Sequence, residues 1–135
     1  MIPSGRPEIV VAAGILTDAT GKILISRRPE GAHMAGWWEF PGGKLGDDET
    51  LLDGLTRELR EELGIEVRSA EPLLSYRHDY PERLVHLHAW RVTGFTGTPA
   101  GLEGQALRWA AVDRLMEIGL LPADLPIVAA LQSMA

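Results

Sequence analysis

The chain has 135 residues, of which 45% are hydrophobic, and a formal net charge of −6 at pH 7. This length predicts one domain spanning residues 1–135 with a core of its own. No cysteine is present, which excludes disulfides and thiolate metal sites and fits a reducing cytoplasm. The acidic balance argues against binding to a nucleic-acid polymer. The apolar run at residues 9–16 is too short to span a bilayer, so no membrane association is expected.

Apolar runs and turn-forming residues predict an alternation of strands and helices along the chain. In chain order we expect a strand at 9–16, a turn at 18–21, a strand at 22–27, a loop at 31–36, an extended piece at 37–40, a helix between 50 and 64, a strand at 67–76, a turn at 79–82, a strand at 84–92, a loop at 94–104, a strand at 106–110, a short helix at 113–118 and a last helix at 125–134. This order predicts an α/β protein, with a mixed sheet and helices on both faces.

The helix between residues 50 and 64 has an apolar stripe and two recognisable ends. Thr50 and Asp53 have the spacing of a capping box, and Gly64 suits the end of the helix. Gly54 in the helix interior is expected to cost up to about 1 kcal/mol of helix stability. The stripe consists of residues that recur at helical spacing, namely Leu52, Leu55, Leu59 and Leu63.

Three carboxylates share another face of this helix, because Glu58, Glu61 and Glu62 stand at positions i, i+3 and i+4. Like charges at this spacing repel by roughly 0.2–0.5 kcal/mol per pair in an isolated helix. Two interpretations follow from the spacing. Either Arg57 and Arg60 neutralise a solvated surface, or the carboxylates bind a hard divalent cation, which prefers oxygen ligands.

A longer pattern surrounds these carboxylates and decides between the two interpretations. Its nine fixed positions between residues 43 and 65 are Gly43, Glu49, Arg57, Glu58, Leu59, Glu61, Glu62, Gly64 and Ile65. All nine match the signature of the Nudix hydrolase family, which this chain resembles. The resemblance implies an α/β/α sandwich with a mixed sheet and a loop–helix–loop catalytic segment. It also implies a metal-dependent hydrolase of nucleoside diphosphates linked to another group.

Further segments resemble the MutT-type 8-oxo-dGTP diphosphatases and the CTP pyrophosphohydrolases. They lie at 27–28 with 32–35, 39–44, 85–90, 103–105 and 122–127. This resemblance implies cleavage of a nucleoside triphosphate to a monophosphate and pyrophosphate. The implied role is to remove oxidised nucleotides such as 8-oxo-dGTP from the nucleotide pool. The alternatives are CTP, dCTP and modified cytidine triphosphates, then another Nudix substrate such as ADP-ribose, then nucleotide binding without catalysis. For the oligomeric state, the sequence is compatible with a monomer and with a homodimer.

The resemblance also assigns roles to individual residues. Glu61 and Glu62 match the carboxylates that bind the metal, together with the carbonyl of Gly42 and the carboxylate of Glu103. Glu58 matches the general base or a ligand of a second metal. Arg57 would orient the carboxylates through charge-assisted hydrogen bonds. The expected catalytic set is therefore Arg57, Glu58 and Glu61, and the expected cofactor is Mg²⁺, with Mn²⁺ as the alternative.

Substrate contacts are assigned in the same way. Arg28 matches a residue that contacts phosphate, although it also suits an exposed strand end. Glu39 and Phe40 belong to a matching segment beside the site. Tyr80 and Arg83 match positions near the base. Tyr80 has a second interpretation, in which it packs a turn before a proline.

Asp124 is where the sequence departs from the 8-oxo-dGTP enzymes, which have asparagine at the matching position. An ionised aspartate only accepts hydrogen bonds, so it favours an exposed amino group such as N4 of cytosine. If burial kept it protonated it would also donate, and oxidised purines would fit again. The alternative is a structural role, because Asp124 precedes the last helix and would suit its N-cap.

Overall fold

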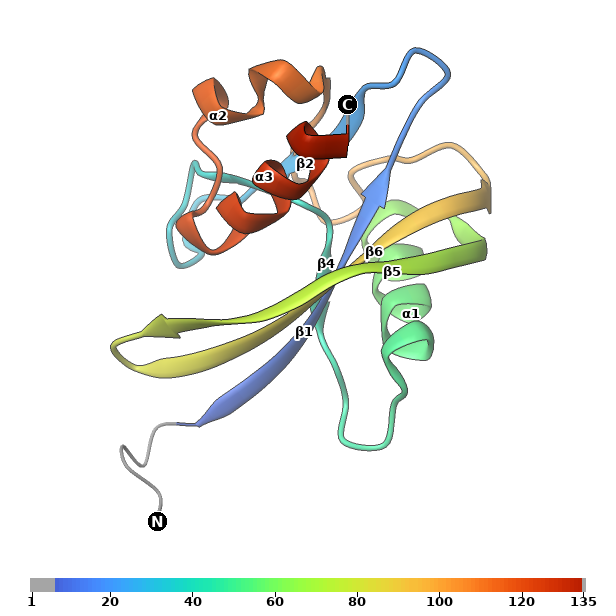
Figure 1. The fold of residues 1–135 in the computed structure, drawn as a ribbon. Coiled ribbons are helices and arrows are strands. Elements are labelled where there is room, and N and C mark those ends of the chain that lie inside the picture. The colour runs from blue at the N-terminus through green and yellow to red at the C-terminus, as the bar shows by residue number, and fades with distance from the viewer. Residues whose placement is uncertain (1–6, 135) are drawn as a thin grey trace.

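The computed structural model describes residues 7–134 (Figure 1). Its elements in chain order are β1 (Glu8–Leu16), β2 (Ile23–Arg27), β3 (Trp38–Glu39), β4 (Gly42–Lys44), α1 (Leu51–Leu63), β5 (Glu66–Tyr80), β6 (Arg83–Thr96), β7 (Leu107–Ala110), the 3-10 turn η1 (Val112–Arg114), α2 (Leu115–Ile118), the 3-10 turn η2 (Pro122–Asp124) and α3 (Leu125–Met134). None of the helices among these residues is long and apolar enough to cross a membrane.

The strands form two sheets around β1 and β2. In the larger sheet the order is β4-β1-β6-β5, and in the smaller one it is β3-β2-β7. Strands β1 and β6 are parallel and their neighbours are antiparallel, so the larger sheet is mixed, as predicted. Helix α1 lies on one side of it and α2 and α3 lie on the other (Figure 1). The predicted α/β/α arrangement is confirmed.

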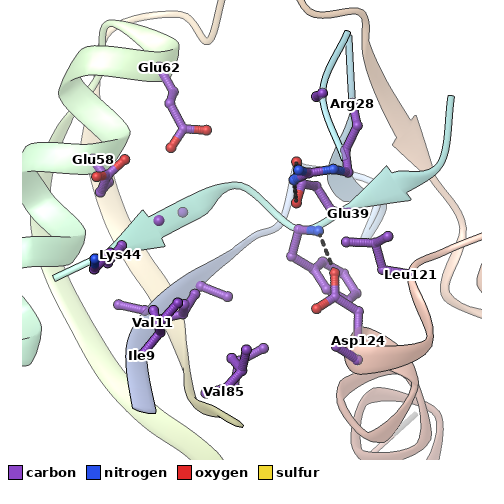
Figure 2. Close-up of a pocket in the computed structure, with 18 of the residues that line it drawn as sticks. Ile9, Val11, Arg28, Glu39, Lys44, Glu58, Glu62, Val85, Leu121 and Asp124 are labelled. Atoms are coloured by element: carbon purple, nitrogen blue, oxygen red, sulfur yellow. Dashed lines mark hydrogen bonds and ion pairs between the residues drawn. The ribbon is translucent and has the colours of Figure 1, made fainter. Parts of the chain in front are cut away.

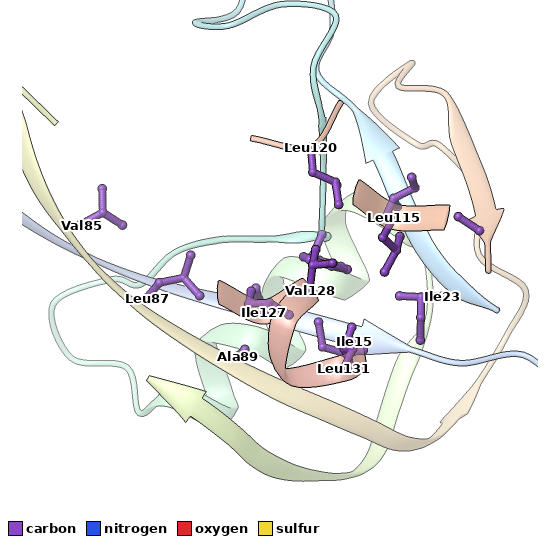
Figure 3. Packing of buried hydrophobic residues seen from close by; sticks show 14 residues of the cluster. Ile15, Ile23, Val85, Leu87, Ala89, Leu115, Leu120, Ile127, Val128 and Leu131 are labelled. Carbon is purple, nitrogen blue, oxygen red and sulfur yellow. The ribbon is translucent and has the colours of Figure 1, made fainter. Parts of the chain in front are cut away.

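The second half of strand β1, from Ala12 to Leu16, is buried on both faces because its alternating residues enter two different cores. Ala12 and Leu16 pack with the buried leucines of α1. Ala13 and Ile15 pack with apolar residues of α3 in the second core. Figure 3 shows this second core, in which Ile127, Val128 and Leu131 lie against Ile15 and against the side chains of Leu87 and Ala89 from β6. The two cores fix α1 and η2–α3 on opposite sides of the sheet.

Helix α1 begins and ends where its sequence predicts. The Thr50 side chain accepts a hydrogen bond from the backbone N–H of Asp53 at 3.1 Å. Gly64 ends the helix with φ of 72°, a conformation that favours glycine. The buried stripe consists of Leu55, Leu59 and Leu63, each 0% exposed, and burying each contributes about 1.5–3 kcal/mol. Leu52 differs from this part of the prediction, because it is 40% exposed.

The prediction was wrong about the lengths of β5 and β6. These strands form a long antiparallel ribbon that runs to Tyr80 and restarts at Arg83. The turn predicted at 79–82 shrinks to two residues, and the first three residues of the loop predicted at 94–104 belong to β6. Gly94 suggested a loop, but it lies opposite a shift in the strand register at Ser69, where a Cβ would come within 2.8 Å of the Ser69 hydroxyl. In the sequence, the glycine of a β-bulge therefore looked like the start of a loop.

Candidate active site

A cavity of about 440 Å³ opens between the helix α1 side of the larger sheet and the segment that carries β3 and η2. Glu58 and Glu62 of α1 lie along one wall (Figure 2). Arg28, Glu39 and Asp124 lie along the opposite wall (Figure 2). The cavity thus has a carboxylate-rich end and a second end that is built from segments far apart in the sequence.

The carboxylate-rich end depends on a close approach between α1 and β4. Glu58 and Glu62 are one helical turn apart, so both side chains reach the cavity. The Glu58 carboxylate lies directly against Gly43, where a Cβ would come within 2.4 Å of its carboxyl carbon. Any side chain at this position would displace the carboxylate. This contact explains why the pattern begins with glycine.

Arg57 holds three carboxylates beside the cavity. Its Nε atom lies 2.6 Å from Glu49, and its Nη1 atom lies 3.0 Å from Glu58 and 2.9 Å from Glu61. Its Nη2 atom also donates to the backbone carbonyl of Lys44 at 3.2 Å. Hydrogen bonds from Arg57, and one from the backbone N–H of Gly46, lower the pKa of Glu49 to about 2. Arg57 therefore orients the helix face and keeps Glu49 ionised.

Glu62 is buried among other carboxylates, and no nearby cation in the described residues balances its charge. Its Oε2 atom is buried and has no hydrogen-bond partner among residues 7–134. Burial raises the pKa of Glu62 to about 9, and the nearby carboxylates of Glu58, Glu103 and Glu39 add to the rise. A bound cation would supply the positive charge that this group of carboxylates lacks. The oxygen-only donor set fits a hard divalent ion such as Mg²⁺.

Of the other predicted metal ligands, two line the cavity and one does not. Gly42 and Glu103 line the cavity. Glu61 does not, because its side chain is 52% exposed and paired with Arg57. Within residues 7–134, no three His, Asp or Glu side chains are arranged to hold a metal ion as they stand. Bringing Glu61 to Glu62 and Glu103 therefore requires the Glu61 side chain to turn away from Arg57.

Asp124 lies at the other end of the cavity and is only 5% exposed. Its Oδ2 atom accepts a hydrogen bond from the backbone N–H of Phe40 at 3.1 Å, and Figure 2 shows its other oxygen turned toward the cavity. Burial raises the pKa of Asp124 to about 7. The structure does not support the predicted N-cap role, since Asp124 ends the turn η2, which runs directly into α3, and its carboxylate bonds to Phe40.

Arg28 is held in place on the same wall of the cavity as Glu39 and Asp124. Its Nη1 atom lies 3.1 Å from Glu39, and its Nε donates to the carbonyl of His33. With 25% of its side chain exposed, Arg28 is not the free surface arginine of the alternative interpretation. Burial raises the pKa of Glu39, and Arg28 offsets part of that rise.

Tyr80 and Arg83 line the same cavity at the tip of the β5–β6 ribbon. The Arg83 guanidinium lies 5.8 Å from the centroid of the Tyr80 ring. Arg83 Nε is buried and has no hydrogen-bond partner in the part of the chain that the structure describes. Sequence reasoning missed Lys44, which also lines the cavity, although its place directly after Gly43 was a usable signal. All of the predicted substrate-contact residues, from Arg28 to Asp124, line this one cavity.

Comparison with known proteins agrees with this geometry. A family model described as the NUDIX domain matches residues 12–130. The chain belongs to the Nudix hydrolase family. Hydrolases of this family generally need a divalent metal ion, and the uncompensated carboxylates around Glu62 fit that requirement.

Named relatives cover nearly the whole of this Nudix hydrolase. It is 45% identical to the CTP pyrophosphohydrolase of Escherichia coli (strain K12), over 93% of this chain and 91% of the relative. It is 35% identical to the 8-oxo-dGTP diphosphatase of the same organism, over 93% and 97% of the two chains. The solution structure of the E. coli ORF135 protein matches with a TM-score of 0.86 and 40% identity, over 99% of this chain and 95% of the other.

Proposed function

We propose that this Nudix hydrolase is a nucleoside triphosphate pyrophosphohydrolase that sanitises the nucleotide pool and works with Mg²⁺, or with Mn²⁺ in its place. The observation that carries the proposal is the division of one cavity into two ends. Carboxylates that suit a divalent ion line one wall, and the buried hydrogen-bonding group of Asp124 lies on the other. A triphosphate at the first end would direct its base to the second.

At the phosphate end, Glu61, Glu62, Glu103 and the carbonyl of Gly42 would hold the metal. When bound, the metal supplies positive charge to the phosphate oxygens and acidifies an attacking water. Glu58 accepts the proton of that water, and the pairing of Glu58 with Arg57 holds its carboxylate in place. The pyrophosphate leaves as the water oxygen bonds to phosphorus.

The guanidinium of Arg28 serves the same reaction from the opposite wall. It is already oriented by Glu39 and by the carbonyl of His33. A preorganised cation close to the leaving phosphates stabilises the charge that develops on them.

At the base end, Asp124 offers one free carboxyl oxygen to the cavity, because the other accepts from the N–H of Phe40. In its protonated form that oxygen donates to O6 of 8-oxoguanine, and in its ionised form it accepts from the N4 amino group of cytosine. A pKa of about 7 makes both forms available near neutral pH. Oxidised guanine nucleotides and cytosine nucleotides are therefore both candidate substrates. The similarity to the relative named CTP pyrophosphohydrolase supports the cytosine nucleotides.

The test compares kcat/KM with Mg²⁺ at pH 6 and pH 8, measured as pyrophosphate release from 8-oxo-dGTP, dGTP, CTP and dCTP and as AMP release from ADP-ribose. We expect the ratio of 8-oxo-dGTP to CTP turnover to fall at the higher pH. There Asp124 loses its proton and can no longer donate a hydrogen bond to O6 of 8-oxoguanine. The variant Asp124→Asn is the matched control, since its amide cannot titrate and its ratio should not change with pH. An equal pH response of the ratio in both proteins would contradict the role of Asp124. No release from any triphosphate would contradict the proposed activity.

A further inference from the structure

The loop at residues 100–105 closes over the last turn of α1. The final carbonyls of a helix have no partner within the helix. Here the backbone N–H of Leu102 donates to the carbonyl of Glu62 at 3.0 Å, and the N–H of Ala100 donates to that of Leu63 at 3.0 Å. The loop that carries Glu103 is thereby attached to the helical turn that carries Glu62.

One side chain completes this attachment. The Nε2 atom of Gln105 donates to the carbonyl of Glu62 at 3.1 Å, and its Oε1 atom accepts from the backbone N–H of Glu103 at 2.9 Å. An amide has a donor at one corner and an acceptor at the other, so a single carboxamide can bridge these two groups. The residues it joins are two of the proposed metal ligands.

The fold of the loop leaves little room for another arrangement. The N–H of Gly104 donates to the carbonyl of Gly101 at 3.0 Å. A Cβ at Gly101 would lie 2.1 Å from the backbone oxygen of Gln105. The loop is therefore folded tightly against itself, with the backbone of Gly101 next to that of Gln105.

We propose that Gln105 is a positioning residue, whose carboxamide holds the backbone of Glu103 at a set distance from that of Glu62 so that their carboxylates converge on one divalent cation. This inference rests on the metal site of the proposed function. Partners that orient metal ligands typically change metal affinity by 10–100-fold when they are removed. Gln105 is not expected to contact the metal or the nucleotide.

A purely structural role for Gln105 makes a different prediction. If the amide only capped α1, its loss would lower stability and would act in the same way whether or not Glu103 could bind metal. If it positions Glu103, its effect on metal binding disappears once the Glu103 carboxylate is gone. A double-mutant cycle with Glu103→Gln separates the two roles.

The test measures binding of Mn²⁺ alone to the full chain by electron paramagnetic resonance. We expect Gln105→Met, which removes both hydrogen bonds and keeps an unbranched side chain, to weaken Mn²⁺ binding about 10-fold. In the Glu103→Gln background the same change should have less than about a 2-fold effect. Gln132→Met is the matched control, because Gln132 also donates its amide to a backbone carbonyl, that of Val112 at 3.2 Å, and it lies outside the residues lining the cavity. This control should bind Mn²⁺ as the wild type does.

Wild-type affinity in Gln105→Met, or an equal loss in the Glu103→Gln background, would overturn the inference and leave the proposed function standing. Failure of the wild-type chain to bind Mn²⁺ would instead overturn the metal site itself, and the inference with it. If Gln105→Met proves unfolded by urea titration, Gln105→Asn takes its place. It keeps the amide but is one methylene too short to reach both partners, so the same loss is expected.

Discussion

Replacing Asp124 by asparagine removes an acid that the fold buries to 5% exposure and leaves its hydrogen bond intact. The amide oxygen of asparagine can still accept from the N–H of Phe40, which now donates to Oδ2 at 3.1 Å. The change in shape is small. What changes is the ability to ionise, so the variant isolates the cost of a buried negative charge.

The pKa shift sets the size and sign of this cost. The pKa of Asp124 rises from 3.8 to about 7, mainly because of burial. The hydrogen bond from the Phe40 N–H opposes the rise, Glu39 adds to it and Arg28 also opposes it. Because the folded value is the higher one, the native state binds more protons, and stability falls as pH rises between about 4 and 7. About three units correspond to at most about 4 kcal/mol, of which about 2.5 kcal/mol is lost between pH 5 and pH 8.

Urea unfolding of both proteins at pH 5 and pH 8, with a chelator present, measures this difference. The other carboxylates titrate in both proteins, so their contributions largely cancel in the comparison. We expect the stability of Asp124→Asn relative to wild type to increase by about 1–2.5 kcal/mol from pH 5 to pH 8. A relative stability that is the same at both values, or that moves in the opposite direction, would show that Asp124 ionises freely in the folded protein.

Three other substitutions test the α1 side of the site. Glu61→Gln should lose most turnover with an unchanged urea midpoint, because its side chain is 52% exposed, and near-native turnover would remove Glu61 from the metal site. Glu62→Gln should lower kcat/KM by at least the 10–100-fold that is typical when a partner of a metal ligand is lost. It should raise the urea midpoint in chelator, because the variant no longer buries an ionisable carboxyl beside Glu58 and Glu103, and a lower midpoint would contradict that reasoning. Gly54→Ala should destabilise by about 1–2 kcal/mol despite the better helix propensity of alanine, because a Cβ there would lie 2.7 Å from Leu45 Cγ. A more stable Gly54→Ala would show that Leu45 repacks freely.

Helix α1 was predictable because its determinants are local. Thr50, Gly64 and the spacing of the buried leucines all act within a few residues, and the structure confirms each of them. The predicted effect of Gly54 on helix stability considered only helix propensity, and it missed a contact with a residue outside the helix. Leu45 occupies the space that a side chain would need, and this packing contact is not visible in a helical pattern.

The second end of the cavity depends on contacts between distant residues. Asp124 and Phe40 are 84 residues apart in the chain, and the packing of α3 against the sheet brings them together. A local pattern could therefore propose a cap or a base contact for Asp124, but it could not predict the bond to Phe40. The same limit applies to Gln105 and Glu62, which are 43 residues apart.

We expect this Nudix hydrolase to cleave a nucleoside triphosphate into a monophosphate and pyrophosphate in a metal-dependent reaction. Phosphorus NMR of the wild-type chain with 8-oxo-dGTP or CTP, with Mg²⁺ and then with excess chelator, tests it most directly. The only products should be pyrophosphate and nucleoside monophosphate, and the reaction should stop once the metal is chelated. Release of inorganic phosphate with a nucleoside diphosphate, or undiminished turnover in chelator, would contradict it.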